Sequence, residues 1–130
     1  MENKKESYDE KRAVAKKFYK TIGSVWCPVL DDYIVFNKRG FRHLIGKNGF
    51  TRPKNEQLRR FHMLSYVQDI LGNPNAILNR KSRESKGLTT DLWIFMADRE
   101  NLHIKVVVRR AGKGKKHFLS IYGKIQKSTP

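Results

Sequence analysis

The sequence predicts an α+β fold in which N-terminal helices pack on one face of a four-stranded antiparallel sheet. Helical periodicity dominates the first half of the chain, over residues 8–22 and 55–71. Beyond Pro74, four runs of branched and aromatic residues are separated by polar or Gly/Lys-rich turns. Helices first and strands afterwards is the order typical of this fold class. Because 130 residues is the length of one domain, we expect a single domain over 1–130, with its core at about 25–125 and a short flexible C-terminal tail.

The first helix is predicted over residues 8–22. Val14, Phe18 and Ile22 recur at helical spacing, and charged residues occupy the other faces. Gly23 ends the pattern, as glycine commonly does just after a last helical turn. We therefore expect an amphipathic helix whose apolar face covers part of the core.

A small hairpin and a short helical element follow. "VWCPVLDDYIVF" contains two short apolar runs separated by the turn-forming pair Asp31 and Asp32, and Pro28 confines the first run to a sheet edge. In "NKRGFRHLIGKNG", glycines on either side leave room for only a turn or two of helix at 41–45. His43 lies in this short element.

The strongest helix pattern is "NEQLRRFHMLSYVQDIL", residues 55–71. Asn55 is the expected N-cap, and Leu64, Val67 and Leu71 share one face. A Gly and a Pro beyond Leu71 end the helix. We expect one continuous helix that buries its leucine face.

Four strand-like runs complete the chain, and we expect them to form an antiparallel meander. Each run is rich in branched or aromatic residues and is followed by a turn pattern. The runs are "NAILNR" (75–80), "TTDLWIFMAD" (89–98), "LHIKVVVRR" (102–110) and "HFLSIYGKI" (117–125).

The charge of the chain indicates a polyanionic partner. Twenty-eight Lys and Arg against 12 Asp and Glu give a formal net charge of +16, a field that attracts nucleic acid. No apolar stretch approaches membrane-spanning length, and the N-terminal residues have no apolar signal region, so we expect a cytoplasmic protein with no membrane partner. Cys27 is the one cysteine, which excludes an internal disulfide framework and a multi-thiolate zinc site.

His43 is the first candidate for chemistry, either as an acid-base group or as a half-buried side chain packed beside Phe41 and Leu44. No carboxylate occurs between Asp32 and Glu56. Among cations the protonated form of a histidine is disfavoured, which suits a general base, and an approaching phosphate would favour protonation again. The nearby cations in the sequence are Arg39, Arg42, Arg52, Arg59 and Arg60.

A second group of polar residues surrounds the last predicted hairpin. It comprises Arg109, Arg110, Lys116, His117, Ser120 and Tyr122. In a strictly alternating strand Phe118, Ser120 and Tyr122 share a face, and aromatic rings beside cations commonly hold single-stranded RNA. The alternative is that serine and tyrosine are ordinary surface residues and that Phe118 belongs to the core.

These residues fit RNA cleavage by the 2′-hydroxyl, which needs a base, an acid and cations around the phosphate, and no metal if the protein supplies all three. A two-metal nuclease would need clustered carboxylates, and those of this chain are scattered. His62, His103 and His117 show no metal-ligand spacing. We therefore expect no metal and no cofactor, and His117 is the only competitor to His43.

The order of these parts resembles the phage-associated branch of the barnase, EndoU, colicin and RelE-like (BECR) ribonuclease superfamily, over roughly residues 25–123. "GFRHL" is similar to its histidine motif, "RFHML" followed by Pro74 and Ile77 to its helix motif, and "LSIY" to the motif of its last strand. The resemblance implies an α+β fold and metal-independent endoribonuclease activity, often that of a toxin or effector against tRNA or mRNA.

Carried over to this chain, the resemblance implies that His43 is the acid-base group, Arg60 a cation that stabilises phosphate, and Ser120 a polar group on the cleavage surface. Tyr122 is one position away from the aromatic of the motif. The second proton-transfer group remains open between His117, Lys116 and Tyr122.

Our leading hypothesis is therefore a ribonuclease that leaves 2′,3′-cyclic phosphate ends. His43, Arg60, Ser120 and Tyr122 would form its catalytic centre, and the substrate-binding residues would be Arg42, Arg59, Arg109, Arg110, Lys116 and His117. The alternatives are a non-catalytic RNA-binding or ribosome-associated module, and a protein that neutralises an acidic toxin or antitoxin. The charge also fits an acidic antitoxin or immunity protein as a partner.

Overall fold

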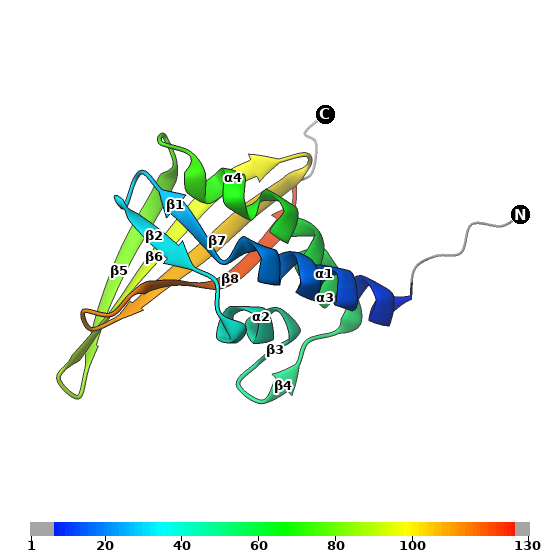
Figure 1. Cartoon of the computed structure of the whole chain (residues 1–130), viewed down its shortest axis with the longest axis horizontal. Helices are drawn as coiled ribbons and strands as arrows, with labels where there is room; N and C mark the ends of the chain where they lie inside the picture. The colour runs from blue at the N-terminus through cyan, green and yellow to red at the C-terminus, as the bar shows by residue number, and fades with distance from the viewer. Residues whose placement is uncertain (1–6, 127–130) are drawn as a thin grey trace, which may run out of the picture.

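The computed structural model of the chain describes residues 7–126, so residues 127–130 of the expected C-terminal tail lie outside the described part. Figure 1 shows its helices and strands. In chain order the elements are α1 (Tyr8–Ile22), β1 (Ser24–Cys27), β2 (Asp32–Val35), α2 (Lys38–Ile45), β3 (Gly46–Lys47), β4 (Phe50–Thr51), α3 (Lys54–Met63), a 3₁₀ turn (Leu64–Tyr66), α4 (Val67–Gly72), β5 (Ile77–Ser85), β6 (Leu88–Arg99), β7 (Leu102–Ala111) and β8 (Lys116–Ile125).

The main sheet has six strands, in the order β1-β2-β8-β7-β6-β5. The predicted antiparallel meander is confirmed in β5 to β8, and the predicted hairpin is confirmed in β1 and β2, with β1 at the sheet edge. The predicted four-stranded sheet is wrong, because the hairpin joins the meander through a parallel pairing. In that pairing Ile34 faces Lys116 and Val35 faces His117. Local sequence patterns predict strands but not which distant edges will meet.

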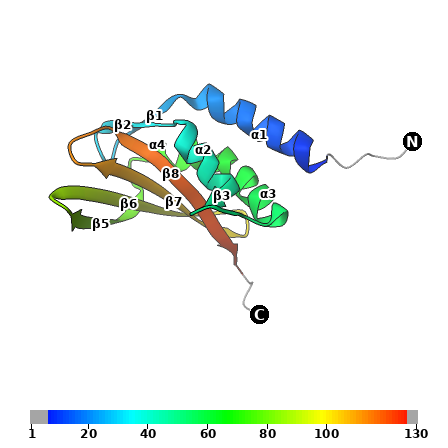
Figure 2. The same ribbon diagram turned by 90° about the horizontal axis from the view of Figure 1, so that it is seen from below.

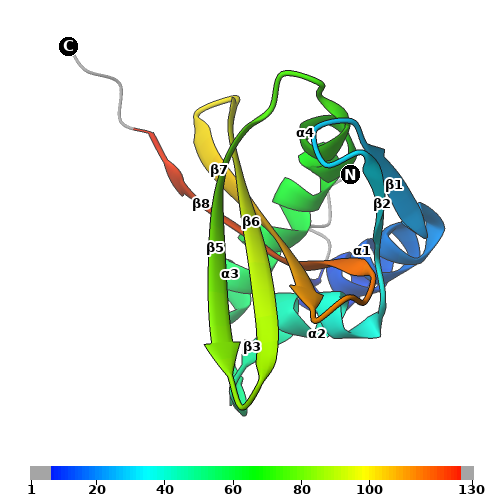
Figure 3. The same ribbon diagram turned by 90° about the vertical axis from the view of Figure 1, so that its left-hand side faces the viewer.

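The helices lie together on one side of the main sheet (Figure 2). Helices α2 and α3 contact β8, and α4 contacts β1, β6 and β7. Figure 3 shows the sheet curving from β5 round to β2 and β1, with α4 on the inside of the curve. The α+β class and the placement of helices on one face of the sheet are therefore confirmed. Among the described residues, no helix is both long and apolar enough to cross a membrane.

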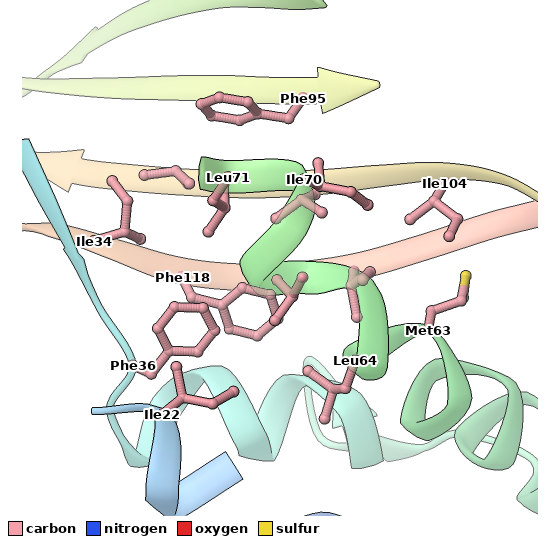
Figure 4. Packing of buried hydrophobic residues seen from close by; sticks show 14 of the residues in the cluster. Ile22, Ile34, Phe36, Met63, Leu64, Ile70, Leu71, Phe95, Ile104 and Phe118 are labelled. Atoms are coloured by element: carbon pink, nitrogen blue, oxygen red, sulfur yellow. The ribbon is translucent and has the colours of Figure 1, made fainter. Parts of the chain in front are cut away.

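The core forms where the helices meet the concave face of the sheet (Figure 4). Leu64, Val67 and Leu71, the predicted leucine face, are fully buried. Phe36 stacks on Phe118 with ring centroids 4.8 Å apart and the planes inclined by 8°. Burying a side chain of this kind contributes roughly 1.5–3 kcal/mol relative to leaving it in water, so these contacts fix the helices on the sheet.

The first helix has the predicted limits, and Phe18 and Ile22 pack on the core as predicted, whereas Val14 does not. Ser7 caps it by accepting a hydrogen bond from the Glu10 main-chain nitrogen at 3.1 Å. Its buried residues are Ala15, Tyr19 and Ile22, whereas the side chain of Val14, predicted to face the core, is 62% exposed. The buried face therefore includes Tyr19, an aromatic residue with a polar hydroxyl, which the simple apolar pattern did not predict to face the core.

The second predicted helix is interrupted. It begins at Lys54 with Pro53 at the cap position and no side-chain cap, so the prediction of Asn55 as the N-cap is wrong. The Ser65 hydroxyl donates to the His62 carbonyl oxygen at 2.7 Å, a contact that commonly bends helices. The chain then continues through the 3₁₀ turn into α4.

Candidate functional site

The short helix α2 is packed tightly against β8. Asn37 caps it by accepting a hydrogen bond from the Gly40 main-chain nitrogen at 3.3 Å, and the Tyr19 hydroxyl donates to the Asn37 carbonyl oxygen at 2.5 Å. A Cβ atom at position 40 would lie 2.7 Å from the Phe118 main-chain oxygen. Glycine at this position therefore allows the helix backbone to approach the strand closely, although glycine was predicted only to bound the helix.

The side chains of α2 divide into three groups. Phe41 and Leu44 are buried and anchor the helix in the core. His43 follows Arg39 by four residues, so the two share one face of the helix. On the other side, Lys38 and Arg42 line a cleft between α2 and α1. One short helix thus separates the histidine from the cleft.

His43 is half-buried and surrounded by positive charge. Its Nδ1 atom is buried and has no hydrogen-bond partner among the described residues, while its carbonyl oxygen accepts a hydrogen bond from Arg52 Nε at 2.9 Å. Burial lowers the pKa of His43 below its ordinary value of 6.5, and the charges of Arg52, Arg39, Lys47 and Arg60 lower that pKa further. The ring is therefore predominantly neutral at neutral pH, as a general base must be.

Arg60 connects α3 to the last strand. Its Nη1 atom donates to Ser120 Oγ at 3.0 Å and to the Ile121 carbonyl oxygen at 2.9 Å. The side chain is nearly covered, with 9% of its surface exposed, and its Nη2 atom lies 3.5 Å from Glu56 Oε1. Burial, followed by the charge of Arg52, lowers the pKa of Arg60, but a guanidinium remains charged in proteins. The chain thus holds a fixed, buried cation beside a hydroxyl.

Glu56 joins the two arginines of the site. Its carboxylate lies 3.9 Å from Arg52 Nη1 and 3.5 Å from Arg60 Nη2. Direct contacts therefore run without a gap from the His43 main chain through Arg52, Glu56 and Arg60 to Ser120. Arg52 contributes two of these contacts.

A β-bulge decides which residues of β8 reach the site. The pairing passes from Val108 opposite Phe118 to Val107 opposite Ser120, so that Leu119 is an extra residue. Phe118 and Ser120 consequently lie on opposite faces of the sheet, and Phe118 is 1% exposed in the core. The predicted strip that included Phe118 is wrong, because strict alternation fails at the bulge.

Ser120 and Tyr122 share a face, as alternation beyond the bulge requires. Tyr122 is 37% exposed. Its ring lies 5.9 Å from the Arg60 guanidinium carbon and 6.0 Å from Lys105 Nζ. The tyrosine is therefore a partly accessible aromatic between two cations, and Lys105 is a residue that sequence reasoning did not select.

Two further predicted residues, Arg109 and His117, face each other across β7 and β8. Together with Arg39 and Lys115 they line a cavity of about 100 Å³. Arg39 reaches this cavity from the same helix face that carries His43. Arg39 and Arg52 were both expected among the cations near His43, and the four-residue spacing from His43 also predicts that Arg39 shares its helix face.

Arg110 and Lys116 have acidic partners. Arg110 Nη2 lies 2.9 Å from Asp91 Oδ2, and Lys116 Nζ lies 2.7 Å from Asp32 Oδ2. Both cations lie over the ring of Trp93, at 5.3 and 5.4 Å from its centroid. Their charges are thus largely compensated within the protein.

Asp91 is the centre of this second cluster. It is buried, and it accepts hydrogen bonds from Ser82 at 2.6 Å, Arg110 at 2.9 Å and Arg80 at 3.1 Å. These hydrogen bonds, that of Ser82 first, hold the pKa of Asp91 well below its usual range. The arrangement is that of a structural ion cluster.

The remaining predicted residues make no contact with Ser120 among the described hydrogen bonds. Arg42 is exposed on the α1 side of α2, and Arg59 is exposed on α3 with no ion pair in the part of the chain described here. His62 is 55% exposed and lies 3.6 Å from Glu100, and His103 Nδ1 lies 2.7 Å from Asp98. Between residues 7 and 126 no three His, Cys, Asp or Glu residues are grouped as a metal site would require.

The described part of the chain is therefore an α+β protein with a cationic, carboxylate-poor site where α2, α3 and β8 meet. Arg39, Arg109 and Lys115 form no ion pair among the described residues and line the cavity beside β8, and the candidate proton-transfer groups are His43, His117 and Tyr122. No family model, curated protein or solved structure matches the chain.

Proposed function

We propose that the protein is a metal-independent endoribonuclease of toxin or effector type. It cleaves RNA by attack of a 2′-hydroxyl on the adjacent phosphate and leaves a 2′,3′-cyclic phosphate. The observation that carries this proposal is the series of contacts from His43 through Arg52, Glu56 and Arg60 to Ser120. The series reaches the main-chain oxygen of His43, and the charges of Arg52 and Arg60 also lower the pKa of its ring, so that a neutral histidine, a buried cation and a hydroxyl share one charged environment.

In this mechanism His43 takes the proton of the 2′-hydroxyl. The freed 2′-oxygen forms a bond to phosphorus, and the bond from phosphorus to the 5′-oxygen breaks. A second group donates a proton to that leaving oxygen. The lowered pKa of His43 keeps the ring available as a base, and binding of a phosphate would offset the repulsion from the surrounding cations.

The second proton comes from His117 or Tyr122. By register both share a face of the sheet with Ser120, whereas Lys116 is bound to Asp32 on the other face. The Tyr122 ring lies 5.9 Å from the Arg60 guanidinium carbon. The substitutions Tyr122→Phe and His117→Gln distinguish the two candidates. Only replacement of the residue that acts as the acid should lower the cleavage rate strongly.

The cations would act on the phosphates. Arg60 would stabilise the negative charge that develops on the phosphorane, since a fixed donor in a covered site needs little reorganisation during the reaction. Arg109 and Arg39, around the 100 Å³ cavity, would hold a neighbouring phosphate. Arg42 and Arg59 remain proposed as outer contacts to the RNA, and an acidic antitoxin or immunity protein would fit the same surface.

The test is incubation of purified protein with total tRNA and a mixed-sequence RNA in EDTA, followed by mapping of the product ends. We expect wild type to leave cyclic phosphates and His43→Ala to be slower by roughly 10²-fold or more. His62→Ala is the matched control, because His62 is exposed and contacts only Glu100 among charged groups of the described chain. Equal rates for wild type and His43→Ala would contradict the proposal.

A second candidate function is RNA binding without cleavage. It is favoured by the cavity lined by Arg39, Arg109, Lys115 and His117, which can hold a phosphate whether or not His43 is a catalyst. Under this alternative no product forms, His43→Ala binds RNA as wild type does, and affinity falls steeply with salt as counterions are released.

A further inference from the structure

A cleft of about 870 Å³ lies between α1 and the segment from Phe36 to Thr51. Figures 1 and 2 show α1 running past α2 and the small β3–β4 hairpin on this side. The cleft is on the face of α2 opposite the one that carries His43. Its basic lining residues are Arg12, Lys16, Lys20, Lys38, Arg42 and Lys47.

Within the described part of the chain, the cations of the cleft have no acidic partners. No carboxylate lines the cleft, and none of its six basic residues forms an ion pair between residues 7 and 126. Arg12, Lys16 and Lys20 follow one another at four-residue intervals, so they form a row along α1 at steps of about 6 Å. Like charges at this spacing weaken a helix, and a bound polyanion would remove that repulsion.

Aromatic rings accompany the cations. Tyr19, Phe36 and Phe41 line the floor of the cleft and are largely buried. Phe50, on the β3–β4 hairpin, also lines it and is 80% exposed. An exposed ring at the rim of a cationic groove is the arrangement on which the bases of single-stranded nucleic acids stack.

We propose that this cleft binds a single-stranded segment of RNA, with phosphates along the α1 row and a base on Phe50. The choice of RNA rests on the proposed function, but the binding does not require the cleavage chemistry. An acidic peptide would satisfy the cations but offers no base to stack on Phe50. The cleft thus extends substrate contact to the side of α2 away from His43.

The probe for this site is a fluorescein-labelled 2′-O-methyl RNA of mixed sequence and about eight nucleotides, within the range that small single-strand binding domains cover. Its methyl groups block cleavage by the 2′-hydroxyl. Binding is measured by anisotropy over a range of salt concentrations. The cleft variant is Lys16→Ala with Lys20→Ala, and the matched control is Lys11→Ala with Lys17→Ala, which removes the same charge from exposed positions of α1 outside the cleft.

We expect the cleft variant to bind about tenfold more weakly and to lower the slope of log affinity against log salt by about 1.4, since each phosphate contact to a single strand contributes about 0.7. The control variant should stay within about twofold of wild type. Phe50→Ala should weaken binding on the order of tenfold with an unchanged salt slope, because stacking releases no counterions.

If the two double variants lost probe affinity equally, the proposal would be overturned, because the RNA would then be held by the overall positive charge and not by the cleft. It would also be overturned if polyglutamate of the same charge bound as tightly as the probe and Phe50→Ala had no effect. His43→Ala separates this proposal from cleavage, because it should bind the probe as wild type does. If RNA is cleaved but the cleft variant binds the probe as tightly as the control, only the cleft proposal is contradicted. If the cleft variant binds the probe more weakly but RNA is not cleaved, only the cleavage proposal is contradicted.

Discussion

Arg60 and Ser120, sixty positions apart in the sequence, are joined by a buried hydrogen bond of 3.0 Å from Nη1 to Oγ. The same nitrogen donates to the Ile121 carbonyl oxygen at 2.9 Å. A guanidinium can make such contacts together because its donors lie in a fixed planar fork. This pair therefore ties α3 to β8 and fixes a cation at the centre of the candidate site.

Replacing Arg60 with lysine should lower the free energy of unfolding by about 1–3 kcal/mol, the usual cost of leaving a buried polar group without its partner. Lysine keeps the charge but does not reproduce the fork. Urea denaturation monitored by circular dichroism measures the change. Arg59→Lys is the control, and as an exposed substitution it should stay within about 0.5 kcal/mol of wild type. Similar effects of the two substitutions would show that the Arg60 contacts do not stabilise the fold.

Gly40→Ala should destabilise the protein by about 1–3 kcal/mol, the range found when a packed core is overfilled. Helix propensity alone predicts the opposite sign, since alanine is favoured over glycine by about 1 kcal/mol inside a helix. The sign reverses because a Cβ atom at position 40 would lie 2.7 Å from the Phe118 main-chain oxygen. The melting temperature provides the measurement.

Gly72→Ala is the control for that substitution, because a Cβ atom there has no neighbour within 4 Å. It should leave the melting temperature unchanged or slightly higher. If Gly40→Ala behaved in the same way, the close approach of α2 to β8 would be wrong.

The pH dependence of cleavage should reflect His43. A general base must be unprotonated, so kcat/KM rises with pH through the pKa of the free enzyme, and burial and nearby cations hold that pKa below 6.5. Arg52→Gln removes the largest of the charge contributions. The acidic limb of the profile should then move to higher pH, toward 6.5. An NMR titration of the His43 ring gives the same pKa without depending on activity, and an unchanged value in Arg52→Gln would contradict the assigned cause.

Asp91→Asn should destabilise the protein at neutral pH and destabilise it less in acid. The pKa of Asp91 is depressed in the folded state from the 3.8 of an ordinary aspartate. The ionised side chain therefore contributes stability that is fully present above about pH 4 and is lost as the pH falls through the folded pKa. The difference in unfolding free energy between wild type and Asp91→Asn should therefore become steadily smaller as the pH is lowered from about 4 to about 2. A constant difference would argue against the ion cluster.

Much of the local structure could be predicted from the sequence. The limits of α1, the short helix around His43, the edge hairpin and the four meander strands all follow from apolar spacing and turn residues. The environment of His43 was also foreseeable in part, because the lack of carboxylates between Asp32 and Glu56 is visible in the chain itself. These features depend on residues that are near one another in sequence.

The bulge at Leu119 could not be predicted, because one unpaired residue in β8 is defined only by the register with β7. It reversed the face of Phe118 relative to Ser120. The pairings of Arg110 with Asp91 and of Lys116 with Asp32 were equally hidden. Both cations look free in the sequence, and their partners come from other strands.

The sequence by itself determined the class of the fold, the strong positive charge and the histidine placed among arginines, since composition and local periodicity carry this information. The tertiary structure alone decided that β2 pairs in parallel with β8, that Arg60 reaches Ser120, and that α1 and α2 enclose a basic cleft. The physical reason is that contacts between distant segments depend on the packing of the whole core, and a local pattern does not specify which surfaces that packing brings together.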